Sequence, residues 1–374
     1  TRSVCWSGPG SHGGCGVLLY TKDNKLVKIN GDPECPYNQG RICAKTLALP
    51  RLMYHPKRIL YPMKRVGKRG ENKWQRISWE EAYDIIVKEF TKIKETYGPE
   101  AIIFCQGTGR DHMAWISRLA YSIGSPNWSA FGPGSGLACY MPRIATMQTI
   151  LGDVIVADMS QMFPDRYDNP NWKTPKCIVI WGNNPLVANS DLFFGHWIVD
   201  CMKRGSELIV VDPRCTWLAS KARIWLQIRP GTDCALALGM LNVIINEELY
   251  DKTFVDEWTV GFDKLREHIQ QYPPQKVEEI TWLPADIIRR AARLYATNKP
   301  ATIPRGNSVE QNVNSFQTGR AIAILRAITG NLDVPGGEIQ PSSIEIPGWL
   351  APEVTLPGEL PADKWEKRVD ADLK

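Results

Sequence analysis

The sequence predicts an α/β fold, with a small β-rich unit at the N-terminus followed by Rossmann-like parallel-sheet domains. Three apolar segments in the middle of the chain each run into a turn rich in Gly, Asn or Asp, and helical stretches separate them. Continuous apolar strands that alternate with helices are typical of a parallel sheet covered on both faces. The segments and turns are 177–181 with Gly182-Asn183-Asn184, 207–211 with Asp212-Pro213-Arg214, and 225–228 with Arg229-Pro230-Gly231-Thr232-Asp233.

A further α/β stretch precedes these strands. Ser78 is followed by Glu81 and then by apolar residues at helical spacing, which indicates a capped amphipathic helix. A short buried strand over 101–104 follows and ends at a glycine turn. The predicted segments are 1–62, the N-terminal unit; 63–150, the first part of an α/β domain that 300–345 completes; 151–299, a second α/β domain; and 300–374, the return to the first α/β domain and an irregular tail.

The N-terminal unit combines a hairpin over 17–29 with cysteines among glycines. Cys5 and Cys15 lie in a glycine-rich loop, and Cys43 follows Cys15 by 28 positions, across the hairpin. Iron–sulfur clusters need converging thiolates from separate chain segments, and glycines let the backbone wrap closely around an inorganic core. The spacing therefore indicates an iron–sulfur domain, with three unrelated thiols as the alternative. Four other cysteines lie in apolar stretches and are expected to be buried thiols: Cys105, Cys177, Cys201 and Cys234.

Composition narrows the class of protein. The net charge of +5 comes from 45 basic and 40 acidic residues without a long basic run, so nucleic acid is not an expected partner. No window approaches the roughly 18 apolar residues of a membrane span. Ten cysteines in 374 residues are too sparse for a small disulfide-stabilised scaffold. With no export signal visible, a cytoplasmic location is expected.

Several motifs, in order, resemble the dimethyl-sulfoxide-reductase family of molybdopterin oxidoreductases. The resemblance covers the chain to about residue 339, and its branch is that of acetylene hydratase and the catechol-dehydroxylase-like enzymes. The motifs include Gly14-Cys15-Gly16-Val17, Asn38-Gln39-Gly40-Arg41-Ile42-Cys43, Arg76-Ile77-Ser78-Trp79-Glu80-Glu81, Gly124-Ser125-Pro126-Asn127-Trp128, Val210-Val211-Asp212-Pro213-Arg214, Arg229-Pro230-Gly231-Thr232-Asp233 and Thr329-Gly330-Asn331-Leu332.

The resemblance implies a bis(molybdopterin guanine dinucleotide) cofactor with Mo or W, and a [4Fe-4S] cluster. The cluster ligands would be Cys5, Cys15 and Cys43, with Ser11 at the position where a fourth cysteine is expected. A serine alkoxide is a hard ligand and is poorly matched to such a site, so the cluster would be serine-ligated, three-iron, labile or missing. Cys35 is a conceivable substitute, although Pro33 and Pro36 predict a turn that faces elsewhere.

The same resemblance assigns residues to the metal and to the dinucleotide. Cys139 would ligate Mo or W, with Ser135 or an inert Cys139 thiol as alternatives, and Lys45 would lie between cluster and pterin. In open α/β sheets, ligands bind beyond the carboxyl ends of the strands, where backbone N–H groups face phosphate. The predicted dinucleotide contacts are Gly182, Asn183, Asn184, Asp212, Arg214, Gly231, Thr232 and Asp233.

The resemblance implies an enzyme of anaerobic metabolism that acts on a small substrate. The reaction would be either redox dehydroxylation or the transfer of a hydroxyl group or oxygen, and an aromatic substrate is one alternative. His12 would act as acid or base, because imidazole titrates near neutrality; a structural role is the alternative. Acetylene hydratase would have an aspartate at that position. A ferredoxin-like electron-transfer subunit is an implied partner. The competing readings are a hydratase without net redox, a nicotinamide dehydrogenase, which lacks its glycine motif here, and a truncated cofactor-binding module without turnover.

Overall fold

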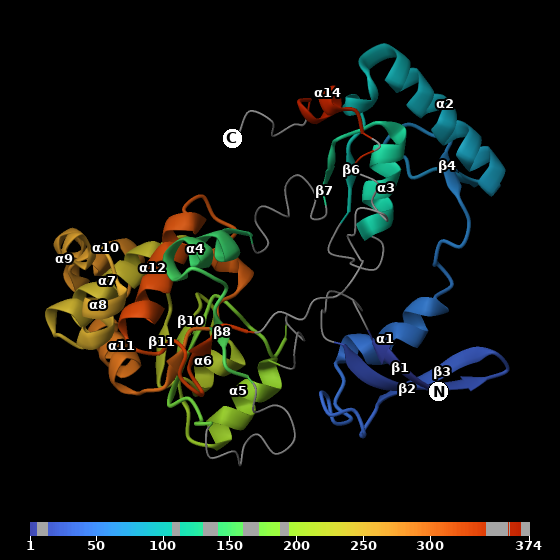
Figure 1. Cartoon of the computed structure of the whole chain (residues 1–374). Coiled ribbons are helices and arrows are strands. Elements are labelled where there is room, and N and C mark those ends of the chain that lie inside the picture. Colours follow the sequence, from blue (N-terminus) through green and yellow to red (C-terminus); the bar gives the residue numbers. More distant parts are fainter. Residues whose placement is uncertain are drawn as a thin grey trace.

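The structure, a computed structural model, describes residues 1–5, 14–106, 113–129, 141–159, 172–187, 194–341, 358 and 360–367. Its described parts form an N-terminal β unit, a small α/β unit and a larger parallel-sheet unit (Figure 1). The α/β fold class predicted from the sequence is therefore confirmed.

The N-terminal unit is a three-stranded antiparallel sheet, in the order β1-β2-β3, with one helix packed on it. The turn between β2 and β3 places Asp23 and Asn24 at positive φ, a conformation favoured by Asp and Asn in tight hairpins. β1 ends and β2 begins at the same end of the sheet, where Cys5 lies directly opposite Cys15. The elements are β1 (Arg2–Cys5), β2 (Cys15–Lys22), β3 (Lys25–Gly31) and α1 (Ala44–Met53).

The small α/β unit is built around a long amphipathic helix, α2. Ser78 caps this helix as predicted, since its Oγ accepts a hydrogen bond from the backbone N–H of Glu81 at 3.1 Å. The unit's elements are β4 (Met63–Arg65), β5 (Trp74–Arg76), α2 (Trp79–Tyr97), the 3-10 helix η2 (Pro99–Ala101), β6 (Phe104–Cys105), α3 (Met113–Ile123), β7 (Trp128–Ser129) and α14 (Ala362–Trp365).

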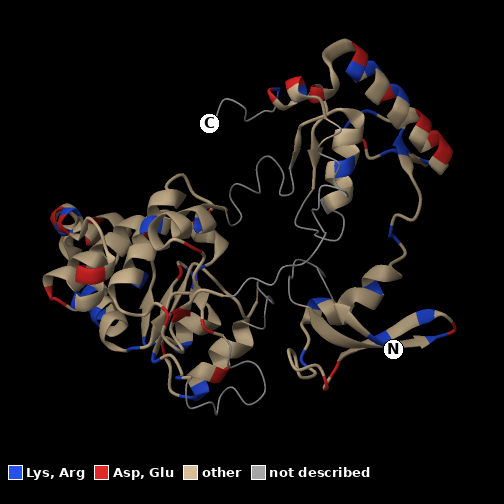
Figure 2. Ribbon diagram, in the orientation of Figure 1, with Lys and Arg blue, Asp and Glu red and all other residues tan. Residues whose placement is uncertain are grey.

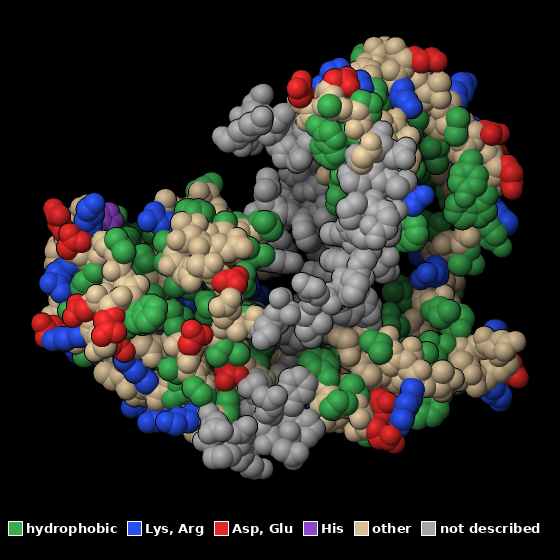
Figure 3. All heavy atoms as spheres, viewed as in Figure 1, with side chains coloured by type: hydrophobic (Ala, Val, Ile, Leu, Met, Phe, Trp, Pro, Cys, Tyr) green, Lys and Arg blue, Asp and Glu red, His purple; other side chains and the backbone are tan. Residues whose placement is uncertain are grey.

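The strand predicted at 101–104 is shorter and later than expected, because Pro99 starts a 3-10 turn and β6 begins only at Phe104. The prediction that Cys105 is buried is wrong: Phe104 and Cys105 are consecutive strand residues and point to opposite faces, and the Phe104 side is buried while the Cys105 side chain is exposed. α2 has no buried residue, and Trp79, Tyr83 and Val87 are exposed on it; apolar side chains are visible on this part of the surface in Figure 3.

The larger unit contains a four-stranded parallel sheet in the order β11-β10-β9-β12. Alternate residues of β9 and β10 face two separate cores, so both faces are covered, as the continuous apolar strands predict. One core is closed by α5 and α6, and the other by α7, α11 and α12. These elements are β9 (Cys177–Trp181), α5 (Phe194–Lys203), β10 (Glu207–Val211), α6 (Trp217–Lys221), β11 (Ile224–Leu226), α7 (Asp233–Asn246), α11 (Ala285–Thr297), β12 (Ala301–Thr302) and α12 (Ser315–Ile328).

The remaining elements surround this sheet. They are α4 (Met141–Leu151), β8 (Val156–Ala157), α8 (Lys252–Trp258), α9 (Phe262–His268), η6 (Ile269–Gln271), α10 (Pro274–Thr281), η7 (Asn307–Val309) and β13 (Glu338–Ile339), which pairs with β8. None of the described helices is both long enough and apolar enough to cross a bilayer. Basic and acidic side chains are interspersed on α2 and on the helices of the larger unit in Figure 2, rather than separated into faces.

The residues after 300 contribute to the larger unit, where β12 adds to the edge of the sheet beside β9. The division of the chain into the predicted domains, with 300–345 completing the domain of residues 63–150, stays a prediction. α12 in turn packs against α4, where a Cβ on Gly319 would lie 2.6 Å from Thr146 Oγ1. β12 has only two paired residues, and such a short apolar segment does not indicate which strand it pairs with. The sequence therefore predicts a strand here but not the sheet that it joins.

Candidate functional site

Three of the predicted cluster ligands meet at one end of the N-terminal sheet. Cys5 ends β1, Cys15 begins β2, and Cys43 precedes the first turn of α1. The hydroxyl of Thr46, a buried residue, lies 3.4 Å from Cys5 Sγ and 3.4 Å from Cys43 Sγ. The hairpin and α1 thus bring thiols from three chain segments to the same place, as the spacing predicts.

The thiol of Cys15 is the most deeply buried of these three groups. Burial, followed by the charges of Cys5, Cys43 and Cys35, raises the pKa of Cys15 to about 11. In the absence of metal, deprotonating these thiols together is unfavourable, because several negative charges gather in a partly buried volume. Bound iron removes that penalty, since thiolate is the form that binds metal.

The donor set fits an iron–sulfur cluster rather than a single ion. Among the described residues, no three His, Cys, Asp or Glu side chains converge closely enough to hold one metal ion. An iron–sulfur cluster spreads its thiolate ligands around a wider core, and thiolates are the ligands it takes. The residues present therefore fit the cluster, with Cys5, Cys15 and Cys43 as the described donors.

Thr46 belongs to no motif that the sequence offers, yet its hydroxyl contacts two of the thiols. Hydrogen bonds to cluster sulfurs stabilise the reduced, more negative state and raise the reduction potential. We expect Thr46→Val to lower the cluster's midpoint potential, on the order of tens of millivolts, without loss of iron. A redox titration followed by electron paramagnetic resonance measures the shift; an unchanged potential would show that the hydroxyl does not bond the ligated sulfurs.

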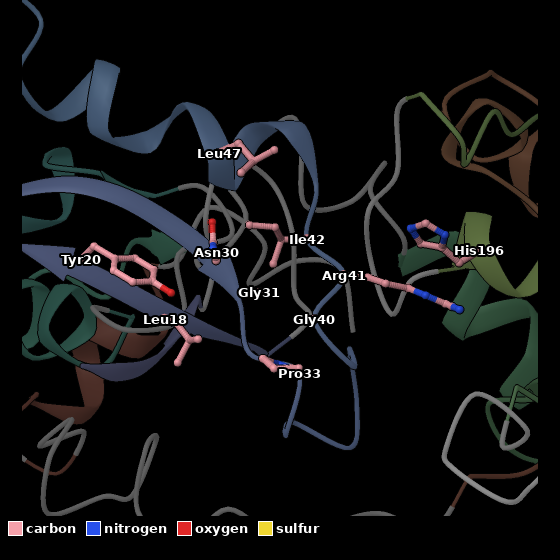
Figure 4. A pocket seen from close by; sticks show the side chains of 10 residues that line it. All are labelled: Leu18, Tyr20, Asn30, Gly31, Pro33, Gly40, Arg41, Ile42, Leu47 and His196. Atoms are coloured by element: carbon pink, nitrogen blue, oxygen red, sulfur yellow. The ribbon is translucent and has the colours of Figure 1, made fainter.

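Lys45 lies in the first turn of α1, two residues after Cys43, and is partly buried. Arg41, two residues before Cys43, extends away from the N-terminal sheet toward His196 of α5, as Figure 4 shows. Its guanidinium lies 3.4 Å from the carboxylate of Asp200. This contact places the N-terminal unit beside the larger unit, across a cleft of about 740 Å³.

A second site lies at the carboxyl ends of the parallel strands. The chain passes from β9 to β10 and β11 on one side of β9, and later returns to place β12 on its other side. This is the point where strand order reverses, and open α/β sheets bind ligands in the crevice there. All eight residues predicted to contact the dinucleotide follow the strands at this edge.

Two glycines allow the chain segments to approach closely at this point. Gly182, at positive φ, follows β9, and a Cβ on Gly306 would lie 2.1 Å from the Gly182 carbonyl oxygen. Ser308 Oγ donates to that same carbonyl at 2.7 Å. Nearby, the buried side-chain oxygen of Asn184 has no hydrogen-bond partner within the part of the chain that the structure describes. A buried acceptor without a partner is unfavourable unless a ligand or water supplies a donor.

The turns after β10 and β11 complete this edge. Asp212 is buried and its Oδ1 accepts from the backbone N–H of Arg214 at 2.8 Å, while the Arg214 side chain is exposed. Gly231 has positive φ and open space where a side chain would lie, and Thr232 directly precedes α7. An exposed guanidinium and a helix N-terminus at one rim suit an anionic ligand.

Asp233 is the first residue of α7 and is partly buried. Its Oδ1 accepts from Trp181 Nε1 at 2.8 Å, which ties α7 to the end of β9. Burial raises the pKa of this carboxyl, whereas the hydrogen bonds from Trp181 and the backbone oppose the shift. A buried carboxylate of this kind can accept hydrogen bonds from N–H donors of a ligand base.

The raised pKa of Asp233 gives a test in the cofactor-free protein. A folded-state pKa above the unfolded value means that protonation favours folding, so stability falls as pH rises through the folded pKa. We expect Asp233→Asn to raise the thermal midpoint near neutral pH, with the gain shrinking toward about pH 4. Exposed Asp256→Asn on α8 is the control, and a lower midpoint for Asp233→Asn at neutral pH would contradict the expectation.

Three predicted residues, Ser11, His12 and Cys139, lie outside the described residues. α4 begins two residues after Cys139 and is anchored to the larger unit. Arg143 of α4 pairs with the buried carboxylate of Glu310, and Arg305 donates to the Arg143 carbonyl at 3.2 Å. The start of α4 therefore lies next to the loop that contacts Gly182.

The fold and the two sites define an iron–sulfur protein with a dinucleotide-type cofactor crevice. The chain belongs to the molybdopterin oxidoreductase family: the family model of that name matches residues 58–349, and the molybdopterin oxidoreductase Fe4S4 domain matches residues 9–55. The cofactors are accordingly a molybdopterin and a 4Fe–4S cluster. The family, enzyme class and cofactor class predicted from the sequence are confirmed.

Curated relatives and a solved structure agree with this assignment. Acetylene hydratase of Syntrophotalea acetylenica is 40% identical over 321 residues, covering 85% of this chain and 41% of that protein. The thiosulfate reductase subunit PhsA of Salmonella typhimurium is 31% identical, covering 92% and 43%. The structure of acetylene hydratase from Pelobacter acetylenicus matches with a TM-score of 0.76 and 34% identity, over 99% of this chain and 49% of that one. The chain thus spans less than half the length of these relatives.

Proposed function

We propose that this chain is part of an enzyme with Mo or W held by two pterin guanine dinucleotides, acting in redox dehydroxylation or in hydroxyl or oxygen transfer on a small substrate. The observation that carries the proposal is that one chain of this family has both a group of converging cysteine thiols and a crevice at the carboxyl ends of a parallel sheet. When bound, the metal supplies two-electron or Lewis-acid chemistry, and the cluster relays electrons singly.

The roles of individual residues belong to the same proposal. Cys5, Cys15 and Cys43 hold the cluster, with the cation of Lys45 next to it favouring an added electron. Cys139 ligates the metal, and His12 holds or delivers a proton. The dinucleotide contacts are Gly182, Asn183, Asn184, Asp212, Arg214, Gly231, Thr232 and Asp233.

Within this site, the chain's own groups orient and neutralise the cofactor. Asn184 offers its unpartnered amide oxygen to a donor of the ligand. Arg214, exposed at the rim, offsets negative charge. Asp233 is held in place by Trp181 and accepts from an N–H edge such as that of guanine.

A hydratase without net redox change is the second candidate. It is favoured by the 40% identity and 85% coverage of this chain in the comparison with acetylene hydratase. A ferredoxin-like electron-transfer subunit is a proposed partner of the redox version only, since hydration moves no net electrons. The cytoplasmic location predicted from the sequence stays a prediction.

Elemental analysis of the native full-length protein, purified without oxygen, is the first test. One Mo or W per chain with about four Fe is the expected result, and absence of both Mo and W would overturn the proposal. Assays on the same preparation then separate the two candidates. Oxidation of a reduced dye that depends on a hydroxylated aromatic substrate supports dehydroxylation, whereas conversion of acetylene to acetaldehyde without dye turnover supports the hydratase.

A further inference from the structure

A fourth thiol, that of Cys35, lies at the cluster end of the N-terminal sheet. Cys35 follows β3 and packs on Gly16, the residue next to Cys15: a Cβ on Gly16 would lie 2.6 Å from Cys35 Cβ and 2.8 Å from Cys35 Sγ.

The turn that carries Cys35 is fixed by hydrogen bonds. The backbone N–H of Cys35 donates to the Asp32 carbonyl at 3.2 Å, and its carbonyl accepts from the N–H of Gln39 at 2.8 Å. Asn38 ties the same turn to β2, since its side chain accepts from the Gly16 N–H at 2.8 Å and donates to the Gly16 carbonyl at 2.9 Å. The prolines beside Cys35 predicted that the turn faces elsewhere, but these contacts hold it against β2.

The chemistry of the cluster creates a need for such a thiol. A four-iron cluster takes four thiolates, and the three ligand cysteines of this chain leave one iron for Ser11 or another donor. Serine oxygen is a hard ligand, whereas thiolate matches the soft site. A cysteine ligand loses its proton as its sulfur bonds iron, without any change of oxidation state.

We propose that Cys35 provides the fourth thiolate of the iron–sulfur cluster, in place of a thiol at position 11. The inference rests on the four-iron cluster of the family to which the chain belongs. It assigns the missing ligand to a turn after the hairpin rather than to the loop between Cys5 and Cys15. The fixed turn, the contact with Gly16 and the shared end of the sheet carry it.

The test compares variants of the full-length protein, purified without oxygen, by iron and sulfide content and by Mössbauer and electron paramagnetic resonance spectra. Cys35→Ala, which leaves no donor atom, should convert the four-iron cluster to a three-iron one, with loss of about one iron in four. Ser11→Ala should leave iron content and spectra unchanged. Cys215→Ser, which removes an exposed thiol after β10, is the matched control and should also change nothing.

A rescue variant guards against a simple folding defect. Adding Ser11→Cys to Cys35→Ala should restore the four-iron spectrum if the only defect is a missing thiolate. A four-iron cluster that survives Cys35→Ala would overturn the assignment to Cys35, and so would a three-iron cluster in the unmodified protein. Absence of iron from the unmodified protein would instead refute the cluster itself, so the two failures are distinguishable.

Discussion

Replacing Cys43 with alanine should abolish the four-iron cluster and leave the fold in place. Cys43 precedes α1 and its side chain does not cap the backbone of the helix, so we expect the alanine variant to keep the start of α1. Its Sγ shares Thr46 with Cys5, which puts it among the cluster thiols. With one thiolate fewer, we expect iron to fall to about three per chain or below and the four-iron spectrum to disappear.

Iron analysis and circular dichroism of the same samples check this result. Cys234→Ala is a matched control, because it removes a partly buried thiol at the start of α7, away from the N-terminal sheet. Its iron content should equal that of the unmodified protein. Full retention of the four-iron spectrum in Cys43→Ala would exclude Cys43 as a ligand.

Replacing Glu338 with alanine should lower the free energy of unfolding by about 3–5 kcal/mol. Glu338 is 0% exposed, and its Oε1 accepts from Thr302 Oγ1 at 2.9 Å and from the Ile303 N–H at 2.6 Å. The same oxygen lies 3.3 Å from Nε of Arg326, which is 4% exposed. Removing the carboxylate leaves a buried guanidinium without its counter-charge and detaches β13 from the chain around β12.

An exposed ion pair provides the comparison. Glu247 accepts two hydrogen bonds from Arg293, at 2.7 and 2.8 Å, but both partners are in contact with solvent. Glu247→Ala should therefore cost only about 0–1 kcal/mol. Urea denaturation of both variants measures the difference. Equal losses would show that Glu338 is not the buried partner of Arg326, and Glu338→Gln should lose less than Glu338→Ala because it keeps an acceptor for Thr302.

Local patterns in the sequence determined much of this protein. Continuous apolar runs predicted β9 and β10, whose residues alternate between two cores. Ser78 and Glu81 predicted the start of α2, and turn residues predicted the hairpin between β2 and β3. Such features depend on side chains a few positions apart, and they can therefore be read without knowing what packs against them.

Only the tertiary structure decided which segments meet. The two paired residues of β12 suit either sheet, and their place beside β9 follows from the buried contacts of α12 and Glu338. Cys105 is exposed because Phe104, its neighbour in β6, takes the buried face of the strand and Cys105 points to the other face. Cys35 and Thr46 belong to no motif, yet backbone hydrogen bonds and helix packing bring them to the cluster thiols. Contacts between residues distant in sequence depend on how the elements pack together, which local periodicity does not specify.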